Sequence, residues 1–228
     1  MQPPFAVLWD LDGVLVDTSR YHFEAWRRLM AEHGRKISED EHRATFGMRN
    51  LDILRRWLHG TDEAEMQRLA ERKERYFRDL LPERIPLMPG VERLVKELAA
   101  TGIPQIVASS TPRANIEEIL SRLHLPLTEF VAAEDVSRGK PDPEVFLKAA
   151  EKLGMPVDRC LVVEDAVAGV EAARRAGMAC LAVASTWPAE DLLGADLVVD
   201  SLEAVSVEEM LRLVQRHRRA KGSRGQAR

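Results

Sequence analysis

The sequence has few of the features that mark secreted, membrane-bound or nucleic-acid-binding proteins. It contains only two cysteines, and Cys160 and Cys180 both lie in apolar, strand-like segments, which is typical of buried thiols in a reducing compartment. No apolar run approaches the roughly 20 residues that a membrane-spanning helix needs. The start of the chain also lacks the basic and then apolar layout of a secretory signal. We therefore expect a cytoplasmic protein without a membrane partner.

The sequence also lacks a net positive charge. The 228 residues carry a net charge of −4, in a composition that is otherwise ordinary for a globular protein, with 45% hydrophobic and 31% charged residues. Six of the lysines and arginines stand in residues 216–228, so that residues 1–215 carry −10 once those six charges are removed. This acidic body argues against nucleic acid as a partner. The basic segment is interpreted as a flexible, solvated tail.

Short apolar runs alternate with helical patterns along most of the chain. The runs are mostly continuous rather than alternating in polarity, as in parallel strands that are buried on both faces. The helical patterns between them end at Gly102, Gly154 and Gly177, and Asp142 with Pro143 marks the start of one of them. This order predicts an α/β fold with a doubly wound parallel sheet. The predicted strands are residues 5–9, 105–108, 130–133, 160–163, 180–184 and 197–199.

One segment breaks the alternation. Residues 19–81 are highly charged and helical in pattern, contain no convincing strand, and end close to several prolines. We interpret them as a small helical domain that is inserted after the first strand and can act as a lid. The predicted organisation is a core of residues 1–17 and 86–215, a helical cap of residues 18–85, and the tail of residues 216–228. We expect the protein to be a monomer.

Reactive side chains follow three of the predicted strands. Asp10 and Asp12 come directly after the first strand, residues 109–111 (Ser-Ser-Thr) after the second, and Glu164 with Asp165 after another. In an open parallel sheet the ligand crevice lies at the carboxyl ends of the strands, so neighbouring strands would bring these groups together. Several carboxylates at one place need a cation, and oxygen ligands favour a hard ion such as Mg²⁺.

Lys140 adds the positive charge that a phosphate ligand needs. It stands just before the Asp142 helix start, and hydroxyls beside an Mg²⁺ site also indicate a phosphate ligand. Each feature alone has a simpler interpretation. The two aspartates and Gly13 can form an ordinary turn or a calcium-type loop, residues 109–111 can cap a helix that begins at Pro112, and Lys140 can be a surface lysine. Glu164 and Asp165 can be a charge pair at a helix start. Their joint occurrence, in this order and at strand ends, favours a site.

In this order the residues resemble the haloacid dehalogenase superfamily. Its four motifs match the stretch Asp10-Leu11-Asp12-Gly13-Val14, then Ser109, Lys140 and Glu164-Asp165, in a resemblance that runs from residue 5 to about residue 202. The inserted helical segment is similar to the cap of its subclass I members. A second aspartate at the position of Asp12 is a feature of the phosphate-handling members rather than of the true dehalogenases.

The resemblance implies covalent phosphoryl transfer with Mg²⁺ as cofactor. Asp10 would attack phosphorus to form an aspartyl-phosphate, and Asp12 would protonate the leaving oxygen and later deprotonate the acceptor. The metal would neutralise charge at the phosphoryl group. The implied metal ligands are Asp10, the backbone carbonyl of Asp12, Asp165 and Glu164, and the implied phosphate-binding residues are Ser109, Ser110 and Lys140.

The cap is similar to that of the β-phosphoglucomutase branch of the superfamily. Thr18, His22, Trp26 and Lys73 stand where that branch has a threonine, a histidine, a tryptophan and a substrate-facing lysine. Each residue also has an interpretation without substrate contact: Trp26 can belong to a helix core, His22 can be a partly buried histidine, and Lys73 can lie in a solvated charged stretch.

Two departures weaken the similarity to the mutases. In the cap loop, Gly47 and Met48 precede Arg49 and Asn50, so that the arginine that would grip a distal phosphate stands one position early. Where the mutases carry a phosphate-binding lysine and asparagine, this chain has Pro112 and then Arg113, which we keep as a candidate substrate residue.

We therefore predict an Mg²⁺-dependent phosphatase that acts on a small phosphorylated metabolite, with sugar phosphates as the favoured substrate class. The alternative is a phosphosugar mutase of the β-phosphoglucomutase type. A non-catalytic binding module of the same fold fits less well, because every catalytic position is filled.

Overall fold

The computed structural model describes residues 3–45 and 48–225, and these form two compact units. Among these residues, unit 1 comprises 3–17 and 86–225, and unit 2 comprises 18–45 and 48–85. We call unit 1 the core unit and unit 2 the cap unit, and each is described by itself.

The core unit is built on a parallel sheet of six strands in the order β3-β2-β1-β4-β5-β6. The chain starts in the middle of the sheet, extends it to one side through β2 and β3, and then crosses to the other side of β1 for β4, β5 and β6. This is the doubly wound order of nucleotide-binding folds, so the predicted fold class is confirmed. The strands are β1 (Ala6–Trp9), β2 (Gln105–Ala108), β3 (Phe130–Val131), β4 (Cys160–Glu164), β5 (Ala179–Val183) and β6 (Leu197–Val199).

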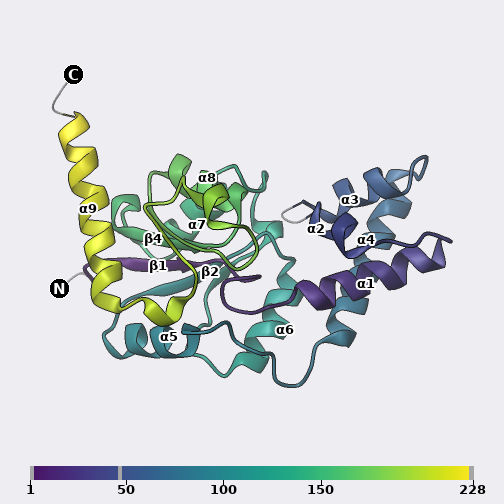
Figure 1. Ribbon diagram of the computed structural model, residues 1–228, viewed down its shortest axis with the longest axis horizontal. Helices are drawn as coiled ribbons and strands as arrows, with labels where there is room; N and C mark the ends of the chain where they lie inside the picture. The colour runs from purple at the N-terminus through teal and green to yellow at the C-terminus, as the bar shows by residue number, and fades with distance from the viewer. Residues whose placement is uncertain (1–2, 46–47, 226–228) are drawn as a thin grey trace. The chain divides into compact units, whose positions relative to one another are not determined.

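Helices cover both faces of this sheet (Figure 1). On one face, Phe146 of α7 and Val170 of α8 share a hydrophobic cluster with Leu8 of β1 and Val162 of β4. On the other face, α5 packs against β2, and α9 packs against β4 and β5. Burial on both faces is the physical reason that the strands read as continuous apolar runs. The helices of this unit are α5 (Val91–Ala100), α6 (Arg113–Leu123), α7 (Glu144–Lys152), α8 (Val167–Ala176) and α9 (Val207–Gly225).

The strand predictions differ from the structure mainly at β3. The apolar pattern predicted a strand through residue 133, but β3 ends at Val131 and a 3₁₀ turn, η1 (Ala133–Asp135), follows. The turn forms because the Asp135 carboxylate accepts a hydrogen bond from the Ala132 N–H at 2.8 Å and draws the chain out of the sheet. The other 3₁₀ turns are η2 (Val157–Arg159), η3 (Ala189–Leu192) and η4 (Leu202–Ala204).

The predicted flexible tail is wrong for residues 216–225, because α9 continues through Gly225. Its basic side chains bind the ends of other elements. His217 Nδ1 lies 3.1 Å from the Asp196 carboxylate, Arg218 donates to Asp158 at 2.9 Å, and Lys221 donates to the Gly177 carbonyl at 2.6 Å. Basic side chains of this segment therefore attach α9 to other parts of the core unit. Composition alone cannot distinguish such side chains from solvated ones.

The cap unit is entirely helical in its described part. Its small hydrophobic core joins Trp26 and Leu29 to Leu54, Trp57 and Leu69, and the two tryptophan rings meet edge to face at 5.4 Å. The helices are α1 (Ser19–Glu32), α2 (Glu39–Arg43), α3 (Asn50–Trp57) and α4 (Glu63–Leu80). Within the described residues, no helix is both long and apolar enough to cross a bilayer.

Candidate active site

The reactive side chains gather where the chain reverses its direction across the sheet. β1 pairs with β4 on one side and with β2 on the other, and Trp9 lies opposite both Val163 and Val107. The residues that follow these strands, Asp10 and Ser109 among them, are therefore brought to one edge. The Asp10 N–H donates to the Val163 carbonyl at 2.9 Å, which continues the ladder to the first carboxylate. This edge is where ligands bind in open α/β sheets.

Lys140 forms the centre of a buried charge cluster. Its ammonium donates to Asp10 Oδ1 and to Glu164 Oε1, the latter at 2.5 Å. All three side chains are at most 10% exposed. Lys140 is therefore not the surface lysine of the simpler alternative, and one cation bridges the ends of β1 and β4.

Both carboxylate oxygens of Glu164 accept hydrogen bonds from other groups of the core unit. Its second oxygen accepts from the N–H groups of Asp165 and Ala166, at 2.8 and 2.9 Å. Gly169 of α8 makes room for it, since a Cβ there would lie 1.8 Å from Glu164 Oε1. These contacts make Glu164 a partner of Lys140 and of the α8 start, and they leave it poorly suited to the metal-ligand role that the sequence suggested.

Asp12 is oriented by Thr111, which the sequence analysis grouped with the reactive side chains after the second strand without giving it a role of its own. Thr111 Oγ1 donates to Asp12 Oδ2 at 2.5 Å, and the Thr111 N–H donates to Ser109 Oγ at 3.1 Å. The N-cap of α6 is Pro112, whose side chain makes no capping hydrogen bond. The Ser-Ser-Thr segment therefore organises the Asp12 side of the site, and its position after β2 was the available signal. Ser110 is exposed beside it.

Burial and crowding change the protonation of these groups. Burial, helped by the charges of Glu164 and Asp12, raises the pKa of Asp10 from 3.8 to about 7 against the opposing effect of Lys140. Burial, followed by the charges of Glu164 and Asp10, also raises the pKa of Asp165. For Lys140, burial lowers the pKa, but Asp10 and Glu164 outweigh burial, so the net pKa rises and the ammonium stays charged. Three buried carboxylates thus share one cation.

This surplus of negative charge fits a divalent cation. Asp10 and Asp165 are only 7% and 4% exposed and offer hard oxygen donors. Among the described residues, no three cysteine, histidine, aspartate or glutamate side chains are placed to close on one ion. Mg²⁺ usually keeps several waters and takes one or two carboxylates, so two aspartates with the Asp12 carbonyl meet its needs.

The candidate cap residues form a polar cluster inside the cap unit. Lys73 is 2% exposed, and its ammonium lies 2.7 Å from His22 Nδ1 and 2.9 Å from Glu74 Oε1. The His22 ring stacks on Phe77 with centroids 4.0 Å apart. The Asn50 amide donates to the same Glu74 oxygen at 2.5 Å.

Lys73 is therefore not a solvated surface charge. Its ammonium also lies 5.3 Å from the Trp26 ring centroid, and both residues are buried. Thr18, at the N-cap of α1, is buried as well, and Arg49, at the N-cap of α3, is exposed. Gly47 lies outside the described residues.

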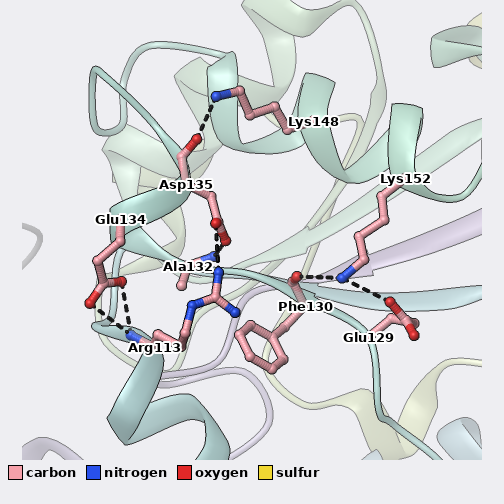
Figure 2. Close-up of polar contacts among 8 residues, drawn as sticks. All are labelled: Arg113, Glu129, Phe130, Ala132, Glu134, Asp135, Lys148 and Lys152. Atoms are coloured by element: carbon pink, nitrogen blue, oxygen red, sulfur yellow. Dashed lines mark hydrogen bonds and ion pairs between the residues drawn. The ribbon is translucent and has the colours of Figure 1, made fainter.

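Arg113 has partners other than a substrate. Its guanidinium donates to Asp135 Oδ1 at 2.6 Å and lies 5.0 Å from the Phe130 ring, and its N–H donates to Glu134 at 2.9 Å. Figure 2 shows these groups side by side, with Lys148 bound to the Asp135 carbonyl. In this arrangement Arg113 fastens the start of α6 to η1, which gives it a structural role.

Comparison with known proteins agrees with this geometry. The profile of the haloacid dehalogenase-like hydrolases matches residues 6–177. A phosphorylated carbohydrate phosphatase of Thermotoga maritima is 38% identical over 180 residues, covering 76% of this chain and 82% of the relative. A β-phosphoglucomutase of Bacillus subtilis is 36% identical over 214 residues, covering 89% and 92%.

A solved structure shows the same architecture. The crystal structure of a β-phosphoglucomutase from Clostridium difficile superposes with a TM-score of 0.84 at 30% identity, covering 93% of this chain and 97% of the other. Relatives of both kinds transfer phosphoryl groups, so the chain is a phosphoryl-transfer enzyme. On the family match, the identities and the shared fold together, the chain belongs to the haloacid dehalogenase-like hydrolase family.

Proposed function

We propose that the protein is a magnesium-dependent phosphatase that hydrolyses a small sugar phosphate through an aspartyl-phosphate on Asp10. The observation that carries the proposal is the buried pair of Asp10 and Lys140, with Asp12 two residues further on at the same strand end. A carboxylate that lies against an ammonium kept charged by its carboxylate neighbours, and next to a second carboxyl group, has the parts needed for nucleophilic attack and for proton transfer.

The proposed reaction has two steps. The Asp10 carboxylate attacks phosphorus, the bond from phosphorus to the sugar oxygen breaks, and that oxygen takes a proton from Asp12. A water then attacks the aspartyl-phosphate, gives its proton to Asp12, and releases inorganic phosphate and the free Asp10 carboxylate. The hydrogen bond from Thr111 holds the Asp12 carboxyl in one orientation during both proton transfers.

Positive charge is supplied from two sources. The Lys140 ammonium would bind the phosphoryl oxygens from its place beside Asp10. Mg²⁺, when bound by Asp10, Asp165 and the Asp12 carbonyl, would neutralise the charge between the attacking carboxylate and the phosphoryl group. Ser109, which is buried beside Thr111, would add a hydroxyl to the phosphate site.

A phosphosugar mutase is the second candidate, and two observations favour it. The similarity to the β-phosphoglucomutases covers about nine-tenths of both chains, and Lys73 and His22 are paired inside the cap unit. The cap loop argues against the mutase. Arg49 stands one position earlier than the phosphate-binding arginine of the mutases, and Asn50, which takes the place of that arginine, donates to Glu74.

One assay separates the two functions. Purified protein with MgCl₂ and β-glucose 1-phosphate, with and without a trace of the 1,6-bisphosphate, is followed for inorganic phosphate and glucose 6-phosphate together. Phosphate release without isomerisation supports the phosphatase, and a panel of sugar phosphates then defines the substrate. Glucose 6-phosphate without phosphate would overturn the phosphatase in favour of the mutase.

The residue roles are tested in the same assay. Asp12→Asn is expected to lower kcat by about 10²–10⁴, the usual contribution of general acid–base catalysis. Asp200→Asn, at an exposed aspartate of the same unit, is the matched control and should keep the parent rate. An unchanged rate in Asp12→Asn would remove that residue from the proton transfers.

A further inference from the structure

The segment after β5 returns to the candidate active site, although no sequence motif marked it. Residues 184–188 leave the carboxyl end of β5 as a turn. The Ser185 hydroxyl donates to the Gly13 carbonyl at 2.6 Å, which ties this turn to the loop that carries Asp12. The next residue, Thr186, forms a side-chain hydrogen bond with the Asp165 carboxylate. Two consecutive hydroxyls thus bind two different parts of the site, the loop after β1 and the Asp165 carboxylate after β4.

Gly13 shows how closely these groups approach. Its φ is +85°, a conformation that favours glycine. A Cβ placed on Gly13 would lie 2.0 Å from Asp165 Oδ2 and 2.8 Å from Thr186 Oγ1. The Asp12 loop, Asp165 and Thr186 therefore meet over one glycine, with no space for a side chain between them.

The environment of Asp165 explains why a hydroxyl there matters. Asp165 is 4% exposed, so solvent has little access to its carboxylate oxygens. A hydroxyl can donate a hydrogen bond to a carboxylate oxygen and so fix the direction of the carboxylate. Because Ser185 anchors the turn independently, the Thr186 hydroxyl holds Asp165 in one rotamer instead of following it.

We infer that Thr186 is a positioning residue that orients the Asp165 carboxylate for Mg²⁺, through its hydroxyl alone. The inference rests on the proposed function in that Asp165 is a metal ligand there. Partners of metal ligands commonly change metal affinity by about 10–100-fold when they are removed. A hydroxyl with this role should matter for binding of the metal before any substrate is present.

The test is calorimetric titration of metal-stripped protein with MgCl₂ alone. Thr186→Val keeps the shape of the side chain and removes the hydroxyl, and its Kd for Mg²⁺ should rise by about tenfold or more. Thr186→Ser should restore a Kd close to that of the parent. The matched control is Thr101→Val, at an exposed threonine whose hydroxyl donates to the Glu97 carbonyl. Thr101 precedes β2, whereas the site residues Ser109 and Thr111 follow that strand, so the variant should bind Mg²⁺ like the parent.

Two results would overturn the inference in distinguishable ways. An equal Kd in Thr186→Val and the parent would refute the role of Thr186 while leaving the proposed phosphatase intact, and the same holds if only the melting temperature in EDTA fell. A parent that binds no Mg²⁺ would refute the metal dependence of the proposed function itself. A supporting result is a higher Kd that is matched by a higher Mg²⁺ concentration for half-maximal activity, with kcat recovered at saturating Mg²⁺.

Discussion

Replacement of Asp10 by asparagine should abolish turnover and, at the same time, stabilise the metal-free protein. The Asp10 carboxylate is buried beside Lys140, and burial, with the charges of Glu164 and Asp12, raises its pKa from 3.8 to about 7 against the effect of Lys140. A pKa difference of this size corresponds to about 4 kcal/mol, because each pKa unit is worth about 1.4 kcal/mol. The asparagine side chain would have nearly the same shape, would carry no charge and would leave Lys140 paired with Glu164.

The sign of the pH dependence follows from linkage. A carboxyl group whose pKa is raised by folding stabilises the folded state only while it is protonated, so its contribution is lost as pH rises from about 4 to about 7. Asp10→Asn does not titrate in this range. The free energy of unfolding of the variant should therefore exceed that of the parent by up to about 4 kcal/mol at pH 8 and by much less at pH 4.5.

Urea unfolding in EDTA, followed by circular dichroism at both pH values, measures this difference. Asp200→Asn, which changes an exposed aspartate, should match the parent at both. A variant Asp10→Asn that is no more stable than the parent at pH 8 would refute the argument that Asp10 is held charged at a cost to stability. MgCl₂ should reduce the difference, because the cation neutralises the carboxylate only in the parent.

Two further predictions concern Gly169, which lies beside Glu164, and His42 in the cap unit. Gly169→Ala should lower kcat/KM at least tenfold and destabilise the core unit by about 1–3 kcal/mol, since the new Cβ would meet the Glu164 carboxylate that binds Lys140. Phosphatase assays and urea unfolding test this prediction, and parent-like values would contradict it. Burial, followed by the charges of His22 and Lys73, lowers the pKa of His42 from 6.5 to about 4, so stability that is complete above pH 6.5 should fall by up to about 3 kcal/mol as pH drops to 4. His42→Gln should remove this part of the pH dependence in thermal melts of the protein, and an unchanged slope would refute it.

Local sequence signals were sufficient for the fold. Continuous apolar runs, helix starts such as Asp142 and stops such as Gly177 are set by short-range chemistry, and they predict the doubly wound sheet that the structure shows. The error at residues 132 and 133 has a local cause as well, since the Asp135 carboxylate competes with the sheet for the Ala132 N–H. A periodicity argument does not include that competition.

The candidate site was predictable only to the level of its residue types. Asp10, Asp12, Lys140 and Asp165 could be named from their order, because the carboxyl ends of parallel strands converge whatever the details of packing. Their partners could not be named, because Thr111 reaches Asp12 and Lys140 reaches Glu164 across long separations in the chain. Hydrogen bonds of this kind depend on strand register and rotamer.

The sequence by itself therefore determined the class of the fold, the helical insertion and the order of the chemically reactive groups. Only the tertiary structure decided how each group is used: Glu164 binds Lys140 instead of standing free, Arg113 joins α6 to η1, and the basic residues between 216 and 225 continue a helix. The physical reason is that composition and periodicity depend on near neighbours in the chain. The charge state and the partner of a side chain depend on what folding brings within a few ångströms of it.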